Sequence, residues 1–355
     1  MRTALCDLLG IDVAIVQGPM AGGWTTPALV AEVCEAGGLG TLAGGRVAAG
    51  DLRSQIEETR RRTRRPFGIN FLIPAPEAER TDDPAVPGVL ARFRERLGLP
   101  EPPPPTLPPA SVDEALEIAL AARVPVISFA MGSPRAYVER VHAAGAIVVA
   151  TVTTVDEALE VAAAGADVVV AQGSEAGGHR STFAPAALDA MPLVGTMALM
   201  PAVVDAVARP VLAAGGIMDG RGIVAALALG AAGVQLGTRF LLATESGAPP
   251  SYRRQLLRAD ETSTFITDVF SGRPARGLRN AFARAFEESG ARPLPYPRQG
   301  ASALDIYRAS LADDGEWATL FAGQGLRLAG TEQPAAAIVR ELVAEVRSVR
   351  DRLAG

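Results

Sequence analysis

The feature that most constrains the fold is a repeated pattern, in which a helical segment ends in small residues and glycine and a short apolar strand follows. The pattern recurs at residues 34–45, 142–152, 162–173 and 228–238. Glycine suits the left-handed conformation that closes a helix, and a run such as VVVA is typical of a strand covered on both faces. This alternation predicts an α/β fold with a parallel sheet.

Eight strands can be placed in the first part of the chain. We expect them at 13–18, 39–43, 67–71, 125–130, 147–151, 167–171, 210–214 and 233–237. Eight parallel strands with intervening helices fit a closed (β/α)8 TIM barrel, which needs about 250 residues. The 355 residues allow such a barrel and an appended subdomain, although length alone also permits two average domains. We predict the barrel over residues 1–243.

The rest of the chain departs from this rhythm. Residues 244–333 carry most of the tyrosines and are predicted to form a small C-terminal subdomain over the barrel mouth, on the substrate side. Residues 334–355 are predicted to form a helix that returns to the outer ring, with an apolar face made by Ile338, Leu342, Val346 and Leu353.

A proline-rich segment, PEPPPPTLPP at 100–109, interrupts the chain between the third and fourth predicted strands. Such a run cannot continue a helix or an inner strand. We interpret it as an exposed polyproline connector, with a role as an SH3-type ligand as the alternative.

Composition excludes several classes of function. A net charge of −5 argues against nucleic acid or an anionic membrane as a partner. Asp7 and Asp12 interrupt the apolar start, so neither a signal peptide nor a membrane span is expected and the cytoplasm is the predicted location. All 34 basic residues are arginine, which excludes lysine Schiff-base chemistry.

Metal chemistry is not expected either. The chain has two histidines and two cysteines, Cys6 and Cys34, which make neither a zinc pattern nor a disulfide framework. The chemistry must therefore come from a cofactor, carboxylates, tyrosines or an imidazole.

The predicted seventh and eighth strands end in glycine-rich segments, LAAGGIMDG at 212–220 and VQLGTRF at 234–240. In TIM barrels a phosphate commonly sits at these loops, where glycines let backbone amides approach it. Simple tight turns are the alternative. The G-x-G-x-x-A spacing at Gly38, Gly40 and Ala43 is discounted as a dinucleotide fingerprint, because it starts at a helix end.

The sixth predicted strand ends in AQGSEAGGHRS, at 171–181. The Gln172 amide can both donate and accept, as a flavin pyrimidine edge requires. Glycines then allow close approach of a flat ligand, and His179 reaches the barrel mouth, where it can serve as a base near neutral pH. A structural histidine is the alternative. His142 is expected to complement the dipole at the end of an outer helix.

With these motifs in place, the chain resembles the nitronate monooxygenase family, formerly called 2-nitropropane dioxygenases, along nearly its whole length. The resemblance is carried by QGPMAGGWTTPALVAEVCEAGGLGTLAGG at 17–45, FGINFLIP at 67–74, AQGSEAGGHR at 171–180, AAGGIMDGRGIVAALALGAAGVQLGT at 213–238, YPRQ at 296–299 and FAGQGLRLA at 321–329.

The resemblance implies an FMN cofactor and assigns residues to it. His179 matches the family's catalytic histidine. Met20 matches the position that meets the flavin ring, and Asn70 and Gln172 match positions that hydrogen-bond FMN. The remaining FMN contacts, the later ones at the phosphate, correspond to Gly177, Gly216, Gln235, Leu236, Gly237 and Thr238.

The implied reaction is the oxidation of alkyl nitronates, such as propionate 3-nitronate, by dioxygen to carbonyl compounds and nitrite. His179 would contact the nitronate or take the α-proton of a neutral nitroalkane. A carboxylate on the substrate would need an arginine, with Arg180 and Arg298 as candidates. Either a monomer or a homodimer is expected.

Two rival interpretations remain. One is an FMN-dependent reductase of the same superfamily, which would use NAD(P)H on an enoyl thioester or a quinone. The other is a flavin-binding protein without turnover, because Ser181 stands where the family usually has glycine and residues 300–311 differ from the family's usual segment.

Overall fold

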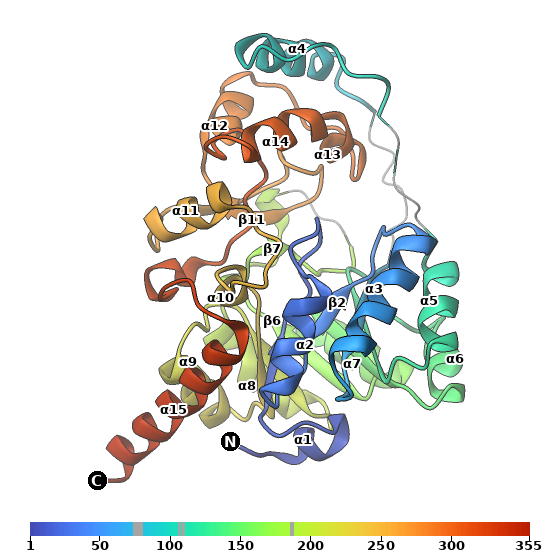
Figure 1. Cartoon of the computed structure of the whole chain (residues 1–355), viewed down its shortest axis with the longest axis vertical. Coiled ribbons are helices and arrows are strands. Elements are labelled where there is room, and N and C mark those ends of the chain that lie inside the picture. Colours follow the sequence, from blue (N-terminus) through green and yellow to red (C-terminus); the bar gives the residue numbers. More distant parts are fainter. Residues whose placement is uncertain (74–80, 106, 108–110, 185–187) are drawn as a thin grey trace.

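Eight parallel strands form a barrel in this computed structural model, which describes residues 1–73, 81–105, 107, 111–184 and 188–355 (Figure 1). Neighbouring strands follow the order β1-β9-β8-β6-β5-β4-β3-β2. The strands are β1 (Ile15–Gln17), β2 (Thr41–Ala43), β3 (Gly68–Leu72), β4 (Val126–Ala130), β5 (Ile147–Val152), β6 (Val168–Gln172), β8 (Val211–Ala214) and β9 (Gly233–Leu236). All eight predicted strands are confirmed, within two residues at each end.

The barrel closes between β1 and the residues just before β2. Val16 and Leu39 form a parallel bridge. The Gln17 N–H donates to the Leu39 carbonyl at 2.8 Å, and the Leu39 N–H donates to the Ile15 carbonyl at 3.0 Å. These bonds complete the ring of strands that a TIM barrel requires.

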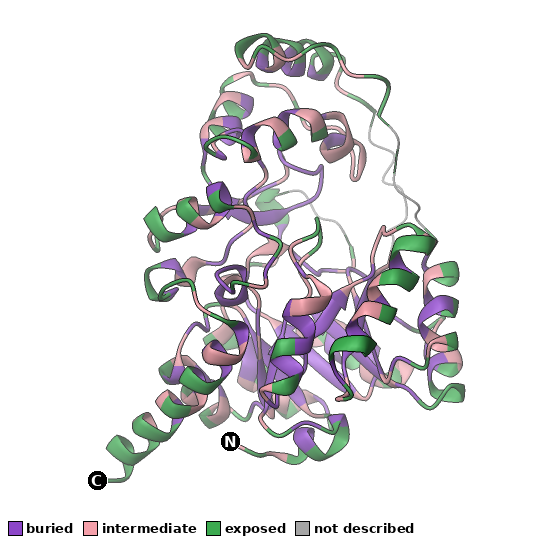
Figure 2. Cartoon of the chain, in the orientation of Figure 1, coloured by how far each residue is buried: buried purple, intermediate pink, exposed green. Residues whose placement is uncertain are grey.

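Helices surround the strands as α/β alternation predicts. Thr26 caps α2 by accepting from the Leu29 N–H at 3.0 Å, and Thr154 caps α7 by accepting from the Glu157 N–H at 3.2 Å. Along each strand, side chains point alternately into the barrel, where they form the inner core, and outward, where they pack beneath the helices. Figure 2 shows the strands as buried. The helices are α1 (Ala4–Leu9), which covers the inner core's lower end, α2 (Pro27–Glu35), α3 (Ala49–Arg62), α5 (Val112–Ala121), α6 (Val138–Ala143), α7 (Val155–Ala164), α8 (Thr196–Ala206) and α9 (Gly220–Ala228).

The C-terminal helix α15 (Ala335–Ala354) packs against α9 and α2, where the eighth helix of the barrel belongs. Ile338, Leu342 and Val346 are buried, as predicted. The prediction for Leu353 is wrong, since it is 72% exposed. The end of α15 projects past the barrel in Figure 1, so its last turn has no surface to pack on.

A second hydrophobic core lies above the barrel in Figure 1. Residues 244–333 contribute most of it, and the predicted boundaries at 243 and 333 remain predictions. Helix α4 (Val86–Arg96), although it comes between β3 and β4, also packs there: the Phe93 ring lies 5.4 Å from Phe282 and 5.1 Å from Trp317. Other elements here are α10 (Thr238–Leu241), α11 (Pro250–Arg258), β10 (Thr264–Thr267), β11 (Ala275–Leu278), α12 (Ala281–Glu288), α13 (Arg298–Ser302), α14 (Leu304–Leu311) and η2 (Gln324–Leu328).

Two smaller segments complete the description. The 3₁₀ helix η1 (Leu188–Ala190) precedes α8. In the proline-rich connector, residues 100–105 and 107 form neither helix nor strand, as predicted, while 106, 108 and 109 lie outside the described residues.

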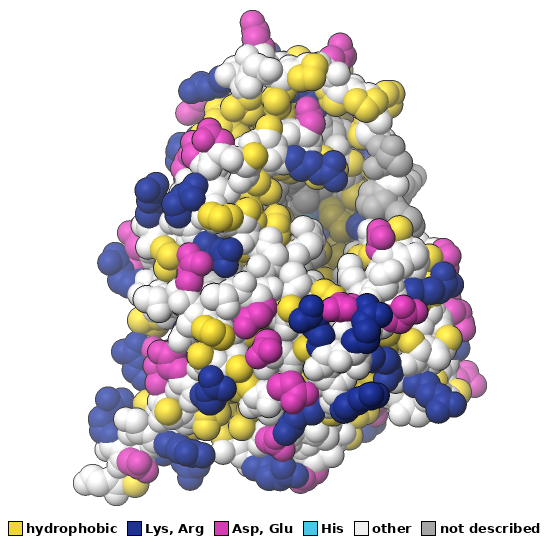
Figure 3. Space-filling model, viewed as in Figure 1, with side chains coloured by type: hydrophobic (Ala, Val, Ile, Leu, Met, Phe, Trp, Pro, Cys, Tyr) yellow, Lys and Arg dark blue, Asp and Glu magenta, His cyan; other side chains and the backbone are white. Residues whose placement is uncertain are grey.

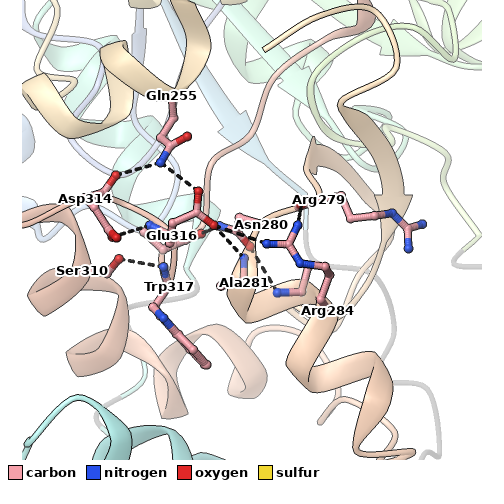
Figure 4. Close-up of polar contacts among 11 residues, drawn as sticks. Gln255, Arg279, Asn280, Ala281, Arg284, Ser310, Asp314, Glu316 and Trp317 are labelled. Carbon is pink, nitrogen blue, oxygen red and sulfur yellow. Dashed lines mark hydrogen bonds and ion pairs between the residues drawn. The ribbon is translucent and has the colours of Figure 1, made fainter. Parts of the chain in front are cut away.

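A polar network centred on Glu316 ties the second core together (Figure 4). The Glu316 carboxylate accepts from Gln255 Nε2 at 3.0 Å and from the Ala281 N–H at 3.1 Å. It also lies 3.6 Å from the Arg284 guanidinium. Because Gln255 belongs to α11 and Ala281 begins α12, this one carboxylate fixes two helices relative to each other.

Truncation of Phe282 should destabilise the second core. The side chain is fully buried, and its ring contacts four other aromatic rings. We expect Phe282→Ala to lower the free energy of unfolding by about 3–5 kcal/mol. Leu353→Ala, at the exposed end of α15, is the control and should stay within about 0.5 kcal/mol of the native value. Urea unfolding monitored by tryptophan fluorescence measures both, and a Phe282→Ala loss below about 1 kcal/mol would contradict this packing.

Candidate active site

Predicted polar residues line the inside of the barrel at the carboxyl ends of its strands. Asn70 on β3 is 5% exposed and donates to Ser128 Oγ on β4 at 3.1 Å. Gln172 follows Val170 by two residues, and Val170 belongs to the inner core. Gln235 follows Gly233, where a Cβ would meet the inner-core Leu5 side chain. Strand side chains alternate, so Gln172 and Gln235 share this inward face.

The Gln172 amide is held by the turn that leads to His179. Its Oε1 accepts from Arg180 Nη1 at 3.2 Å and from the Ser181 N–H at 3.0 Å. Its Nε2 donates to the His179 carbonyl at 3.1 Å. Within the described residues, one amide N–H of Gln172 keeps no partner and is what the side chain can offer a ligand.

Three of the predicted cofactor residues are glycines, and they differ in what surrounds them. A Cβ on Gly237 would meet no atom within 4 Å. Gly216 has a φ of +72°, which L side chains rarely adopt, and a Cβ there would lie 3.4 Å from Glu175. At Gly177 a Cβ would meet the Ala322 and Gly323 backbone at 2.6 Å. The chain's own packing therefore already requires glycine at 177.

Met20, Leu236 and Thr238, the remaining predicted cofactor residues, differ in what their side chains contact. Met20 packs against both the outer barrel core and the second core, at the level of the barrel mouth. The Leu236 side chain is buried beneath the helices, so only its main chain can contact a ligand. Thr238 Oγ1 accepts from the Gly323 N–H at 3.0 Å, which brings the 321–325 loop over the end of β9.

The same loop contacts the end of β6. The Gln324 N–H donates to the Glu175 carbonyl at 3.0 Å. The Glu175 carboxylate accepts from the Thr196 N–H at 2.9 Å and so holds the start of α8. The FAGQG motif thus joins the two strand ends that carry Gly177 and Thr238.

His179 belongs to a three-stranded sheet that stands over the barrel. It lies on β7 (Gly178–His179), which pairs with β11 so that His179 is opposite Ala275. Its Nε2 is 2.9 Å from Ser271 Oγ. The rings of Tyr296 and Phe321 each lie 5.2 Å from the imidazole. Figure 3 shows a hollow between the barrel and the upper part, edged by hydrophobic and basic side chains.

The surroundings of His179 disfavour its protonated form. The residue as a whole is half-buried, and dense protein around the imidazole withdraws it from bulk water. Burial first, and then the positive charges of Arg273 and Arg46, lower the pKa of His179 to about 3. At neutral pH the imidazole is therefore uncharged, and positive charge in the site comes from the two arginines.

The pH dependence of turnover should reflect this low pKa. A histidine whose folded pKa lies near 3 stays neutral from pH 5 to pH 8, whereas an unperturbed one titrates near 6.5. We expect kcat/KM to show no histidine titration in that interval. An inflection near pH 6.5 that disappears in His179→Asn would contradict this environment.

Three residues at the site were missed by the sequence analysis, namely Arg46, Ser271 and Arg273. Arg46 directly follows the glycine pair at the end of β2, a signal of the same kind as those used at the later strands. Ser271 and Arg273 lie in the loop before β11, and only the pairing of β11 with β7 brings them to His179. No local pattern marks them.

The two arginines considered for a substrate carboxylate are engaged with the chain itself. Arg298 makes an ion pair with Asp82 at 2.7 Å and is 43% exposed. Arg180 is 1% exposed, and its Nη1 donates to the Gly173 carbonyl at 2.7 Å. His142 lies in the last turn of α6, as predicted, with its Nε2 2.9 Å from Asp167.

The described part of the chain offers neither a metal cluster nor a membrane-spanning helix. No cluster of three or more His, Cys, Asp or Glu side chains there could hold a metal ion. No helix there has the length and apolarity needed to cross a membrane.

Comparison with known proteins gives the site its context. The model of the nitronate monooxygenase family matches residues 2–345. The chain belongs to this family. A probable nitronate monooxygenase from Staphylococcus haemolyticus is 40% identical over 97% of both chains, and one from Staphylococcus saprophyticus is 36% identical over 99% of both.

Solved structures agree on the fold. The nitroalkane oxidase from Streptomyces ansochromogenes is 40% identical, with a TM-score of 0.89 over 99% of this chain and 100% of that one. FabK from Thermotoga maritima is 32% identical, with a TM-score of 0.79 over 100% of this chain and 99% of that one. This member of the nitronate monooxygenase family is thus a TIM-barrel oxidoreductase of the flavin-dependent monooxygenase type, acting on a small molecule.

Proposed function

We propose that this enzyme uses FMN to oxidise alkyl nitronates, such as propionate 3-nitronate, with dioxygen to carbonyl compounds and nitrite. The observation that carries the proposal is the surroundings of His179. A neutral imidazole, fixed by Ser271 and two aromatic rings, lies near two arginine cations and above the inward-facing amides of the barrel. Such a site favours an anionic substrate next to a flat, hydrogen-bonding cofactor.

The described residues fit FMN. Open space at Gly237 and the turn at Gly216 suit a phosphate at the ends of β8 and β9. The amides of Asn70, Gln172 and Gln235 would hydrogen-bond the isoalloxazine ring from inside the barrel, and Met20 would pack against the ring. Gly177, Thr238 and the main chain of Leu236 would complete the cradle.

Each side chain has a task in the proposed reaction. FMN, when bound, supplies the electron transfer between nitronate and dioxygen. Arg46 and Arg273 attract the anion, and His179, held by Ser271, positions it. Phe321 and Tyr296 pack beside the imidazole and exclude water from it. Since the nitronate arrives deprotonated, no group needs to remove an α-proton.

Cofactor and products test the proposal together. Heat should release FMN alone from the purified protein, identified by chromatography against FMN and FAD standards. Under air, propionate 3-nitronate should yield nitrite in proportion to the oxygen consumed. Released FAD, or oxygen uptake without nitrite, would contradict the proposal. The cytoplasmic location and the choice between monomer and homodimer stay predictions.

The reductase alternative has weaker support. The enoyl reductase domain of MlnA from Bacillus amyloliquefaciens has a TM-score of 0.68 with this chain, but it is 13% identical and so shares only the fold. Steady-state oxidation of NADH or NADPH with an enoyl thioester or a quinone would favour this alternative.

A further inference from the structure

Arg46 has an unusual combination of burial and free hydrogen-bonding capacity. Its residue is half-buried just after β2, and its Nη1 is buried without a hydrogen-bond partner. None of the ion pairs found across the described residues involves it. A buried charged donor without a partner is costly to the fold, so it indicates a partner that binds from outside.

The backbone at Arg46 adds a second observation. Its φ is +63°, in the left-handed region that a non-glycine residue rarely occupies. Such strained residues persist where the surrounding structure fixes them, and they cluster at ligand sites. The left-handed backbone at Arg46 determines the direction in which its side chain leaves the main chain.

The Arg46 side chain reaches the part of the site that contains His179. The Arg46 guanidinium carbon lies 4.6 Å from the centre of the Tyr296 ring, and the same ring lies 5.2 Å from His179. Arg46 is also close enough for its charge to lower the pKa of His179. The cation therefore stands in the aromatic cluster that surrounds the imidazole.

Arg273, the other cation near His179, is differently engaged. It is 3% exposed, and its Nη2 donates to the Thr182 carbonyl. It contributes charge to the site, but part of its guanidinium is committed to the chain. Of the two cations that lower the pKa of His179, Arg46 is the one with a buried donor that has no partner within the described residues.

We propose that Arg46 binds the nitronate oxygens of the substrate and makes the site selective for the anionic nitronate over the neutral nitroalkane with the same carbon skeleton. This inference rests on the proposed function. A nitronate, like a carboxylate, is planar with two negatively charged oxygens, and a guanidinium fork matches that geometry. The cation–π contact with the Tyr296 ring would hold the Arg46 guanidinium in place beside His179.

Ethyl nitronate and nitroethane provide the test, because they differ by one proton. In Arg46→Met, which keeps the length of the side chain over Tyr296, the KM for ethyl nitronate should rise about tenfold to a hundredfold, as the loss of a charged hydrogen bond predicts. The KM or inhibition constant for nitroethane should change by less than about threefold. Arg46→Lys should recover part of the loss, and Arg53→Met, on the exposed face of α3, should behave as the native enzyme.

Two further measurements do not depend on turnover by a variant. Nitrate, a planar oxyanion, should perturb the bound-flavin spectrum of the native enzyme, and its affinity should fall in Arg46→Met by a factor similar to that for ethyl nitronate. In the native enzyme, added salt should raise the KM for ethyl nitronate but leave that for nitroethane unchanged.

Several outcomes would overturn the proposal. These are equal losses for ethyl nitronate and nitroethane, a loss confined to propionate 3-nitronate, which would assign Arg46 to its carboxylate, or nitrate binding unaltered in Arg46→Met. If the native enzyme oxidises no nitronate at all, the proposed function fails. The nitrate measurement then still decides whether Arg46 binds an oxyanion.

Discussion

Replacing Gly237 by valine is expected to give a folded protein that has lost at least nine-tenths of its flavin and its activity. A Cβ at this position meets no protein atom within 4 Å, so the fold itself does not need glycine here. The space is at the end of β9, where TIM barrels commonly bind phosphate. Losing even one charged hydrogen bond to the phosphate weakens binding about tenfold or more.

The controls separate the loss of cofactor from the loss of fold. Gly50→Val changes another glycine whose Cβ would meet nothing, on the exposed face of α3, and should keep full flavin. Gly216→Val is a poorer test, because its φ of +72° strains any side chain whether or not a phosphate binds. Flavin absorbance per protein and far-ultraviolet circular dichroism give the result. Full flavin occupancy in Gly237→Val would show that the phosphate lies elsewhere.

His179→Asn is expected to lower kcat/KM for ethyl nitronate and to raise the inhibition constant of nitroethane by similar factors, about tenfold to a hundredfold. Asparagine keeps a polar group of similar reach but cannot act as a base. With a pKa of about 3, His179 is a weak base at neutral pH, so its contribution is to position the substrate. Loss of positioning affects both compounds, whereas loss of a base affects only the neutral one.

The comparison also has a clear opposite outcome. If His179 is the base, nitroethane turnover should fall by about 10² to 10⁴ while nitronate turnover falls much less. Flavin content must be measured in each preparation, so that cofactor loss is not taken for lost chemistry. Freshly made nitronate is needed, because slow reprotonation would blur the contrast.

The barrel could be predicted from sequence because its signals are local. The strands are short apolar runs, and several helices carry their own N-cap, as Thr26 does for α2 and Thr154 for α7, so Val168–Gln172 and its neighbours are found without knowledge of the rest. The end of α15 shows the limit of such patterns. Leu353 continues the apolar spacing of its helix, but the barrel surface ends before the helix does.

From the sequence, only the half of the candidate site that the barrel provides could be located. Asn70, Gln172 and Gln235 lie at strand ends, where fold geometry alone directs them inward. The other half depends on contacts distant in sequence: His179 meets Ser271, which is 92 residues away, through the pairing of β7 with β11. Arg46 reaches Tyr296 across the gap between the barrel and the second core. Tertiary packing creates these neighbours, and no local pattern encodes them.

Anaerobic mixing of the purified enzyme with propionate 3-nitronate and, separately, with NADH distinguishes a nitronate oxidase from a nicotinamide-dependent reductase. The flavin spectrum is recorded in a stopped-flow instrument before oxygen is admitted. The nitronate should change the flavin spectrum within the turnover time, and NADH should not. Oxygen should then restore the oxidised spectrum with release of nitrite. Rapid reduction of the flavin by NADH, with no response to the nitronate, would contradict nitronate oxidation and identify the enzyme as a reductase.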